Sequence, residues 1–447
     1  MNKNFFIEEK SYATPHIENH FRDHDIHRLL KLGILQYRHV TNEYIFKYVG
    51  GIHNANSLNF ILPKYIANEN CVSNIYRSKQ IIKILHRTNE EFNSSLELLD
   101  FTFGKNETLN DGLVSIALFL LEDYLENGYY SKIIDSKELN GLGEIDWEET
   151  ILYKEPIIFD KSVVYIDYIS NGQDISHASL ITLIHQFVLN YFYTLYGDWI
   201  DFPPELMVLN GDFDIENLGP DDFLLAELQK ELALTFKDRE IRVLKSLIST
   251  LEKVFSQDDF HTEIYGTKKF HVVWETVCGY IFNNRVHMFK QHIPKPLWQD
   301  MNSNPLYHTA SLRPDIVTLK SINSSSHLFI LDAKYYRIQF TTDKLIGAPS
   351  LEDLTKQILY ELSLKKTSHE FIVNALLFPE NEDLLLKEGD VSENGIFTAF
   401  GKITLDFISS NPILLIYLNT EKVYNMFLES KYLVDRDYIS LTNLYKM

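Results

Sequence analysis

The sequence predicts a multidomain α+β protein with a small β unit at its N-terminus, a helical middle region and a C-terminal α/β domain with a central mixed sheet. Two β-rich runs lie within the first 65 residues, and helical periodicity fills most of the middle of the chain. Beyond residue 256 the order becomes helix, strand, strand, helix, strand. We therefore expect domains over residues 1–105, 106–255 and 256–447, the first of which could contact a partner protein.

Composition and length point to a globular protein. Of the 447 residues, 13% are aromatic, which favours well-filled cores. No apolar run reaches the roughly 18 residues of a membrane span, and the N-terminus lacks a signal-peptide pattern. Two cysteines are too few for a disulfide framework or a zinc site. We therefore expect a cytoplasmic protein that does not bind membranes.

The charge balance bears on the partners of the chain. Acidic residues outnumber basic ones by 62 to 42, so the formal net charge is −20. Proteins that bind DNA strongly and alone usually carry a basic face. The chain could still carry a basic cleft on an acidic body, because basic residues cluster between positions 334 and 366. The balance favours a protein that depends on a partner for nucleic-acid affinity.

The N-terminal region combines a helix and a hairpin. Residues 19–35 read as an amphipathic helix with one apolar side made of Ile26, Leu29, Leu30 and Ile34. Four histidines spaced by about one turn could line one face as metal ligands, but a solvated polar face is favoured because no cysteine joins them. These are His16, His20, His24 and His27. Residues 44–51 and 58–65 then read as two strands of a hairpin.

The rest of the chain follows two patterns. Helices are expected over residues 74–100, 111–127, 177–195 and 220–255, the last with a break near Thr235. The polar segment Ser256–Asp259 is the candidate boundary. The elements expected beyond it are helix 269–283, strands 313–319 and 327–333, helix 350–366, and strands 371–378 and 412–418.

The helix expected over residues 350–366 has a clear beginning. Ser350 is its predicted N-cap. Its expected buried stripe consists of Leu351, Leu354, Ile358 and Leu362. Gln357 lies off the centre of this stripe, where it could reach the water shell of a metal ion or a phosphate.

Two acids and a lysine dominate the C-terminal domain. Asp332 and Lys334 end an otherwise apolar strand and point to the same face of it. Asp315 begins the preceding strand, so a hairpin would bring it beside Asp332. Charges at the end of a buried strand need a partner or a metal. Carboxylate oxygens suit Mg²⁺, and a lysine can stabilise charge that develops on a phosphate. The pattern predicts metal-assisted phosphodiester hydrolysis.

These residues also match a family pattern. Pro314-Asp315 with Asp332-Ala333-Lys334 resembles the PD-(D/E)xK nuclease signature. The helix that carries Asp353 and Gln357 resembles the Asp…Gln…Tyr helix of the McrC and RecB-like branch, in which the tyrosine follows the glutamine by four residues. Here Tyr360 follows Gln357 by three residues. With an N-terminal β unit that ends in Leu62-Pro63-Lys64-Tyr65, the chain looks like a LlaJI-type restriction endonuclease subunit, the McrC-like partner of an AAA+ GTPase.

The resemblance assigns roles to further residues. An acid on the helix before the first strand is usual in the family, and Glu275 supplies it here. Asp315, Asp332, the Ala333 carbonyl and Glu275 would bind Mg²⁺, Lys334 would polarise the water or the oxyanion, and Glu275 and Gln357 would assist positioning. Arg313 and Lys356 could contact DNA phosphate. The implied partners are double-stranded DNA, a McrB-like AAA+ GTPase and a cognate methyltransferase, as in an anti-phage restriction-modification system.

Other interpretations remain open. Lys334 and Arg313 could simply pair with the acids of a structural hairpin. The chain could be a non-catalytic adaptor that binds and stimulates the AAA+ GTPase, although an adaptor has no need of the Asp315, Asp332 and Lys334 set. A stand-alone Type II restriction enzyme is disfavoured by the acidic balance. Serine or cysteine nucleophile chemistry lacks its usual motifs.

Overall fold

The computed structural model divides the chain into two compact units. It describes residues 2–54, 57–66, 71–92, 112–160, 162–176, 179–203, 215–255, 262–293, 295, 297–299, 306–308, 312–336, 338–340, 344–365, 367, 369–380, 390–391, 395–405 and 411–446. One unit contains Met1–Lys105 and His261–Met447, and the other contains Asn106–Phe260. The predicted first and third domains therefore lie in one unit. The predicted boundary at Ser256–Asp259 falls outside the described residues.

Two small sheets form the N-terminal part of the first unit. The larger sheet has the order β1 (Asn2–Ile7), β6 (Ser57–Leu62), β5 (Val49–Asn54) and β11 (Glu263–Thr267). The smaller sheet has the order β2 (Ser11–Ala13), β4 (Glu43–Phe46) and β3 (Leu35–Arg38). The predicted hairpin is confirmed for β5 and β6, which pair antiparallel. The run predicted as a single strand over residues 44–51 instead supplies β4 to one sheet and β5 to the other.

The pairing of β11 with β5 joins two segments that the whole second unit separates in the sequence. Gly50 lies opposite Gly266 in this antiparallel pair. Their φ angles are +143° and +157°, which L side chains rarely adopt. A Cβ on Gly50 would lie 2.3 Å from the Tyr265 carbonyl oxygen. Glycine is therefore required for the two backbones to approach this closely.

The single helix predicted over residues 19–35 is wrong. Two helices form instead, α1 (Thr14–Glu18) and α2 (Asp23–Lys31), and Leu35 already begins β3. The break has a physical cause, because the Asp25 side chain accepts a hydrogen bond from the Arg22 backbone N–H at 3.2 Å and caps a new helix. His16, His24 and His27 are exposed, as a polar face requires.

The C-terminal part of the first unit is built on a six-stranded mixed sheet, as predicted. Its order is β14 (Ile316–Ile322), β15 (Ser325–Ala333), β18 (Phe371–Glu380), β21 (Ile413–Asn419), β20 (Phe397–Ile403) and β19 (Asp390–Val391). Strands β15, β18 and β21 are parallel, and the other three pair antiparallel with their neighbours. Helix α12 (Leu351–Leu364) connects β15 to β18.

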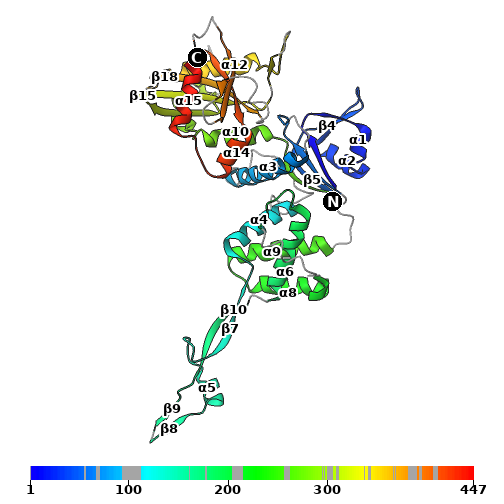
Figure 1. The fold of residues 1–447 in the computed structure, drawn as a ribbon, viewed down its shortest axis with the longest axis vertical. Helices are drawn as coiled ribbons and strands as arrows, with labels where there is room; N and C mark the ends of the chain where they lie inside the picture. Colours follow the sequence, from blue (N-terminus) through cyan, green and yellow to red (C-terminus); the bar gives the residue numbers. More distant parts are fainter. Residues whose placement is uncertain are drawn as a thin grey trace. The chain divides into compact units, whose positions relative to one another are not determined.

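Helices cover both faces of this sheet (Figure 1). On one face, Leu364 of α12 packs in a core with Val317 and Ile330. On the other face, the ring of Phe329 lies 5.0 Å from that of Tyr438 in α15 (Asp435–Lys446). Helices α3 (Cys71–Phe92), α10 (Phe270–Ile281) and α14 (Thr420–Leu428) pack against one another beside it. Because Phe329 and Ile330 are consecutive, each face of β15 has its own core.

The predicted buried stripe of α12 is confirmed for Ile358, which is buried, and for Leu354, which packs against the same core, but it is wrong for Leu351 and Leu362. Leu351 and Leu362 are 70% and 42% exposed, whereas Gln357 and Glu361 are each 1% exposed. The reason is Asn374 on β18, which is fully buried. Its amide lies between the two, accepting from Gln357 Nε2 at 2.7 Å and donating to Glu361 Oε2 at 3.0 Å. Hydrogen bonds to a buried polar group therefore fix the rotation of this helix.

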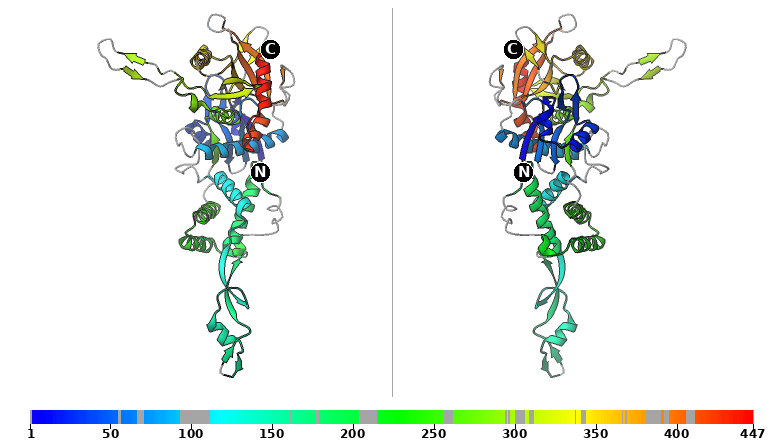
Figure 2. Two further views of the ribbon diagram at one scale, coloured as in Figure 1. Left: turned by 90° about the vertical axis from the view of Figure 1, so that its left-hand side faces the viewer. Right: turned by 90° about the vertical axis from the view of Figure 1, so that its right-hand side faces the viewer.

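The second unit is helical, as predicted, with a β ribbon that the sequence did not reveal. Its long helices are α4 (Leu113–Asn127), α6 (Leu180–Tyr196), α8 (Asp221–Leu234) and α9 (Asp238–Phe255). The break near Thr235 is confirmed. Figure 2 shows the ribbon, in which β7 (Lys132–Leu139) pairs with β10 (Ile169–Ser176) and carries α5 (Trp147–Tyr153), β8 (Ile157–Phe159) and β9 (Ser162–Val164) at its end. Across the described ranges, no helix has both the length and the apolar character of a membrane span.

Candidate active site

The β14–β15 hairpin brings the predicted residues together. In this antiparallel pair Ile316 lies opposite Leu331, so Asp315, one residue earlier, arrives beside Asp332. The carboxyl groups of Asp315 and Asp332 lie within hydrogen-bonding reach of each other. The Ala333 backbone N–H also donates to Asp315 Oδ2 at 3.0 Å. The two acids therefore share one end of the hairpin.

Lys334 completes the cluster. Its Nζ lies 2.6 Å from Asp332 Oδ2, which confirms that the two side chains leave β15 on the same face. The same Nζ donates to Asp353 Oδ1 at 3.0 Å, and Asp353 lies in the first turn of α12. Both ion pairs are largely buried, so solvent screens them little. Lys334 is thus held between the strand and the helix.

The electrostatics show an excess of negative charge. Burial, together with the nearby carboxyls of Asp332 and Glu275, raises the pKa of Asp315 to about 8. Burial alone would lower the pKa of the Lys334 ammonium, but Asp332 and Asp353 raise it above its ordinary value. Lys334 is therefore a cation at neutral pH and no proton acceptor. One ammonium does not balance the carboxyl groups around it.

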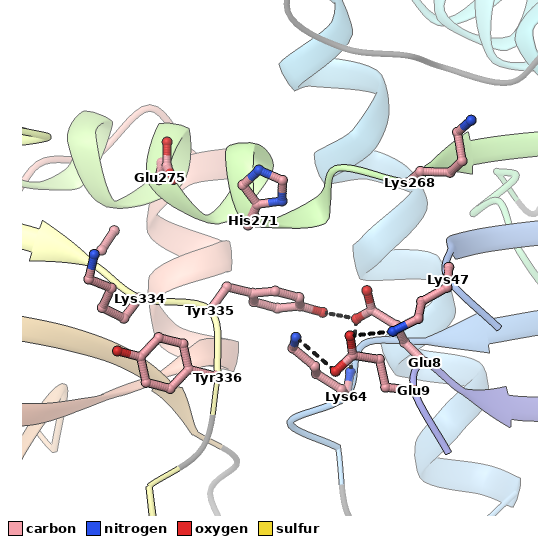
Figure 3. Close-up of a pocket in the computed structure, with 11 residues that line it drawn as sticks. Glu8, Glu9, Lys47, Lys64, Lys268, His271, Glu275, Lys334, Tyr335 and Tyr336 are labelled. Carbon is pink, nitrogen blue, oxygen red and sulfur yellow. Dashed lines mark hydrogen bonds and ion pairs between the residues drawn. The ribbon is translucent and has the colours of Figure 1, made fainter. Parts of the chain in front are cut away.

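Glu275 faces this cluster from α10. It is half-buried, and burial and the charge of Asp332 raise the pKa of its carboxyl above the ordinary value. The positive charges of Lys334 and Arg313 act to lower the pKa of this carboxyl. Its charge interactions with Asp315, Asp332 and Lys334 place it on the side of α10 that faces the hairpin. Figure 3 shows Glu275 on α10 above the strand end that carries Lys334.

Gln357 lies apart from the pocket. Its amide nitrogen donates to the Ile330 carbonyl at 3.2 Å and to Asn374 Oδ1 at 2.7 Å, inside the core between α12 and the sheet. These bonds hold β15 and β18 in place beneath the acids. A direct role for Gln357 toward a metal or phosphate stays a prediction.

The two predicted DNA contacts are on the surface. Arg313 is exposed, and its backbone carbonyl accepts a hydrogen bond from the Tyr360 hydroxyl at 3.0 Å. Lys356 is exposed and forms an i,i+4 ion pair with Glu352 at 2.5 Å. Both side chains are accessible to a ligand, and their contact with DNA stays a prediction.

Three further residues position the site, and nothing in the sequence indicated one of them, Asn284. Asp353 both orients Lys334 and caps α12, because its Oδ2 accepts from Ser350 Oγ at 2.7 Å. The Asn284 side chain donates to the Asp315 carbonyl at 2.6 Å and accepts from the Val317 backbone N–H at 3.0 Å. Tyr360 holds the backbone of Arg313, two residues before Asp315. The resemblance to the Asp…Gln…Tyr helix pointed to Asp353 and Tyr360, and the capping-box pattern of Ser350 also pointed to Asp353.

A polar pocket of about 340 Å³ opens beside the acids (Figure 3). Glu275, Ala333 and Lys334 line one side of it. Residues that follow β1, β4 and β6, including Glu9, Lys47 and Lys64, line another side. The pocket is thus shared between the two β-containing parts of the first unit.

The donor set fits Mg²⁺. Within the described residues, no three histidine, cysteine or acidic side chains already form a cage for a metal ion. Mg²⁺ needs no such cage, because it keeps several waters and binds through one or two carboxylates and substrate phosphate. The neighbouring carboxyls of Asp315 and Asp332 supply that minimum, and their crowding is what a divalent cation would relieve.

Comparison with known proteins identifies the family. A sequence model of the LlaJI restriction endonuclease family matches residues 48–421. The chain belongs to the LlaJI restriction endonuclease family. It is also 32% identical over 438 residues to the Type II restriction enzyme BsuMI component YdjA of Bacillus subtilis strain 168, covering 96% of this chain and 90% of that protein. These similarities support a subunit of a restriction system.

Solved structures give more distant likenesses. The refined half-complex of Thermococcus gammatolerans McrB AAA+ hexamers with bound McrC contains a chain with a TM-score of 0.39 and 13% identity, over 96% of this chain and 99% of that chain. A chain of the McrBC complex from the same organism has a TM-score of 0.25 and 13% identity, over 61% of this chain and 85% of that chain.

Proposed function

We propose that this LlaJI-family chain is the Mg²⁺-dependent endodeoxyribonuclease subunit of an anti-phage restriction system, with a PD-(D/E)xK core. The observation that carries the proposal is the cluster of Asp315, Asp332 and Lys334 at one end of the β14–β15 hairpin. The order α10, β14, β15, α12, β18 around a mixed sheet is the one that the nuclease signature implies. The substrate is double-stranded DNA.

The chain's own residues would act as follows. Asp315 and Asp332 would hold Mg²⁺, with Glu275 and the Ala333 carbonyl beside them. When bound, Mg²⁺ would neutralise charge on the phosphodiester and acidify a water. Lys334 stays protonated and fixed by Asp353, so its ammonium would stabilise negative charge that develops on the phosphate oxygens. Asn284 and Tyr360 would keep the Asp315 backbone in position.

We further propose that the chain works with a McrB-like AAA+ GTPase and that a cognate methyltransferase protects host DNA. The net charge of −20 favours a partner that supplies DNA affinity. The ribbon of the second unit also exposes apolar side chains to an extent that is typical of interaction surfaces. Its exposed members include Ile151, Leu152, Tyr153, Ile158 and Phe159, at 60–77%.

The experiment that tests the nuclease proposal is cleavage of plasmid DNA by the full chain with its GTPase partner and GTP. Cleavage should require Mg²⁺ and should stop when EDTA is added. The two carboxylates are themselves negatively charged, so the charge on the phosphate is neutralised only when they hold a cation. Replacing Mg²⁺ with Mn²⁺, another cation that prefers oxygen ligands, should preserve cleavage. Undiminished cleavage in excess EDTA would exclude the metal-dependent mechanism.

The adaptor alternative rests on a different observation. The exposed apolar ribbon belongs to the second unit and lies outside the part of the chain that holds the acids. A chain that used only this ribbon could stimulate a GTPase without cutting DNA. Asp315, Asp332 and Lys334 would then be dispensable in every assay.

A further inference from the structure

The polar pocket beside the acids contains cations that the nuclease proposal does not use. Lys47 and Lys64 enter it from the segments that follow β4 and β6, and Lys268 borders it from the segment before α10, where its ammonium donates to the Leu32 backbone carbonyl at 3.2 Å. With Lys334, they give the pocket four lysines. Figure 3 shows Lys47 and Lys64 converging on the carboxylate of Glu9. The N-terminal part thus brings positive charge to the wall next to the proposed scissile site.

This wall is fixed to the strand that carries Lys334. The Tyr335 hydroxyl donates to Glu8 Oε2 at 2.5 Å, and Glu8 is buried. The Lys64 backbone N–H reaches the same oxygen at 3.4 Å. The Lys64 ammonium also lies 4.9 Å from the centre of the Tyr335 ring, within the range of a cation–π contact. Lys64 therefore contacts Tyr335, the residue that directly follows Lys334 in the sequence.

Glu9 occupies the position that an anionic ligand of these lysines would take. Its two carboxylate oxygens accept from Lys47 Nζ at 3.0 Å and from Lys64 Nζ at 3.1 Å. Burial raises the pKa of this carboxyl, but the hydrogen bonds from the two lysines outweigh it, so the pKa lies below its ordinary value. Glu9 also has a φ of 61°, a left-handed conformation that is unfavourable for a residue other than glycine.

We propose that Lys47 and Lys64 bind a DNA backbone phosphate next to the scissile one, and that Glu9 takes the place of this phosphate when DNA is absent. The inference rests on the proposed nuclease function, and it assigns the N-terminal sheets to the DNA-binding surface. Like a carboxylate, a phosphate presents several acceptor oxygens to lysine ammonium groups. The N-terminus of α10, with its positive partial charge, lies just beyond Lys268.

The exchange of Glu9 for phosphate requires little energy. The side chains of Glu9 and Lys47 are 42% and 41% exposed, and that of Lys64 is 23% exposed. Ion pairs between partly exposed side chains of this kind contribute little to stability. A DNA phosphate, by contrast, releases condensed counterions when lysine neutralises it. DNA can therefore displace Glu9 from its lysines at low salt.

The test is the affinity of the full chain, assembled with its GTPase partner, for a short fluorescent DNA duplex, measured by anisotropy over a series of salt concentrations in EDTA, where no cleavage occurs. Lys47→Gln and Lys64→Gln should each weaken binding several-fold and lower the slope of log affinity against log salt by about one. Glu9→Gln should strengthen binding several-fold, because it removes a competing charge without changing the size of the side chain. If these residues had a purely structural role, the lysine variants and Glu9→Gln would not change the affinity for DNA in opposite directions.

The control is Lys431→Gln, since Lys431 is exposed and pairs with Glu429 outside the pocket. It should leave affinity and slope unchanged. The proposal is overturned if the pocket variants bind as the wild type does, if Glu9→Gln weakens binding, if the chain binds no duplex at the lowest salt, or if inorganic phosphate at matched ionic strength displaces the duplex, which would indicate a site for a free anion. Failure of the nuclease proposal would be detected in a different assay. It would appear as unchanged plasmid cleavage by Asp332→Ala, and this result does not depend on how the affinity for DNA varies with salt.

Discussion

Asp332→Ala should reduce plasmid cleavage by more than about a hundred-fold, since even a residue that only supports a metal ligand typically contributes 10- to 100-fold. The variant loses a proposed Mg²⁺ oxygen and also the 2.6 Å ion pair with Lys334. The fold should survive, because the substitution relieves the crowding of carboxyls around Asp315. The measurements are single-turnover cleavage with partner and GTP, and the unfolding temperature.

A matched control separates chemistry from general damage. Asp435 also pairs with a lysine, Lys320 at 3.7 Å, but is 75% exposed at the start of α15. Asp435→Ala should cut DNA as the wild type does. GTP hydrolysis by the partner should be unaffected by Asp332→Ala. If Asp332→Ala cuts as fast as the wild type while GTP hydrolysis still depends on the chain, the adaptor interpretation is correct.

Lys334→Met should cause a loss of about a hundred-fold or more, because removing one donor to the charge that develops in a transition state typically costs 10²–10³ in rate. Methionine keeps most of the side-chain volume but leaves Asp332 and Asp353 facing each other without the cation between them. The loss should appear in the rate of the chemical step at saturating DNA, as measured in single turnover. DNA affinity should change far less.

Asp353→Asn is the companion variant. Asparagine retains the hydrogen-bonding shape but no longer pairs with Lys334 by charge, so cleavage should fall by a smaller factor of about 10. If Asp353→Asn is as inactive as Lys334→Met, Asp353 does more than orient the lysine. If Lys334→Met cuts at the wild-type rate, the ammonium has no part in the chemistry.

The local chemistry of the hairpin could be predicted from the sequence. Strand alternation alone places Asp332 and Lys334 on one face, and antiparallel pairing places Asp315 beside them. The middle helices followed from their periodicity and from the break near Thr235. These features depend on residues that are close in sequence, which is why pattern analysis detects them.

The features that escaped prediction depend on distant pairing or on buried polar groups. No local pattern shows that β11 pairs with β5 across the entire second unit. The rotation of α12 is set by Asn374 on the following strand, so Leu351 and Leu362 are exposed although the pattern predicted them to be buried. The contact between Glu8 and Tyr335 joins residues 327 positions apart. Side-chain contacts at such separations cannot be inferred from a single sequence.

The central claim is that the carboxylates of Asp315 and Asp332 hold a divalent cation. Direct binding of Mn²⁺ to the full chain, followed by electron paramagnetic resonance in the absence of DNA and GTP, tests it without reference to cleavage. The wild type should bind the ion, and a chain carrying both Asp315→Asn and Asp332→Asn should lose this binding while staying folded. Equal binding by the two proteins, or none by the wild type, would contradict the account.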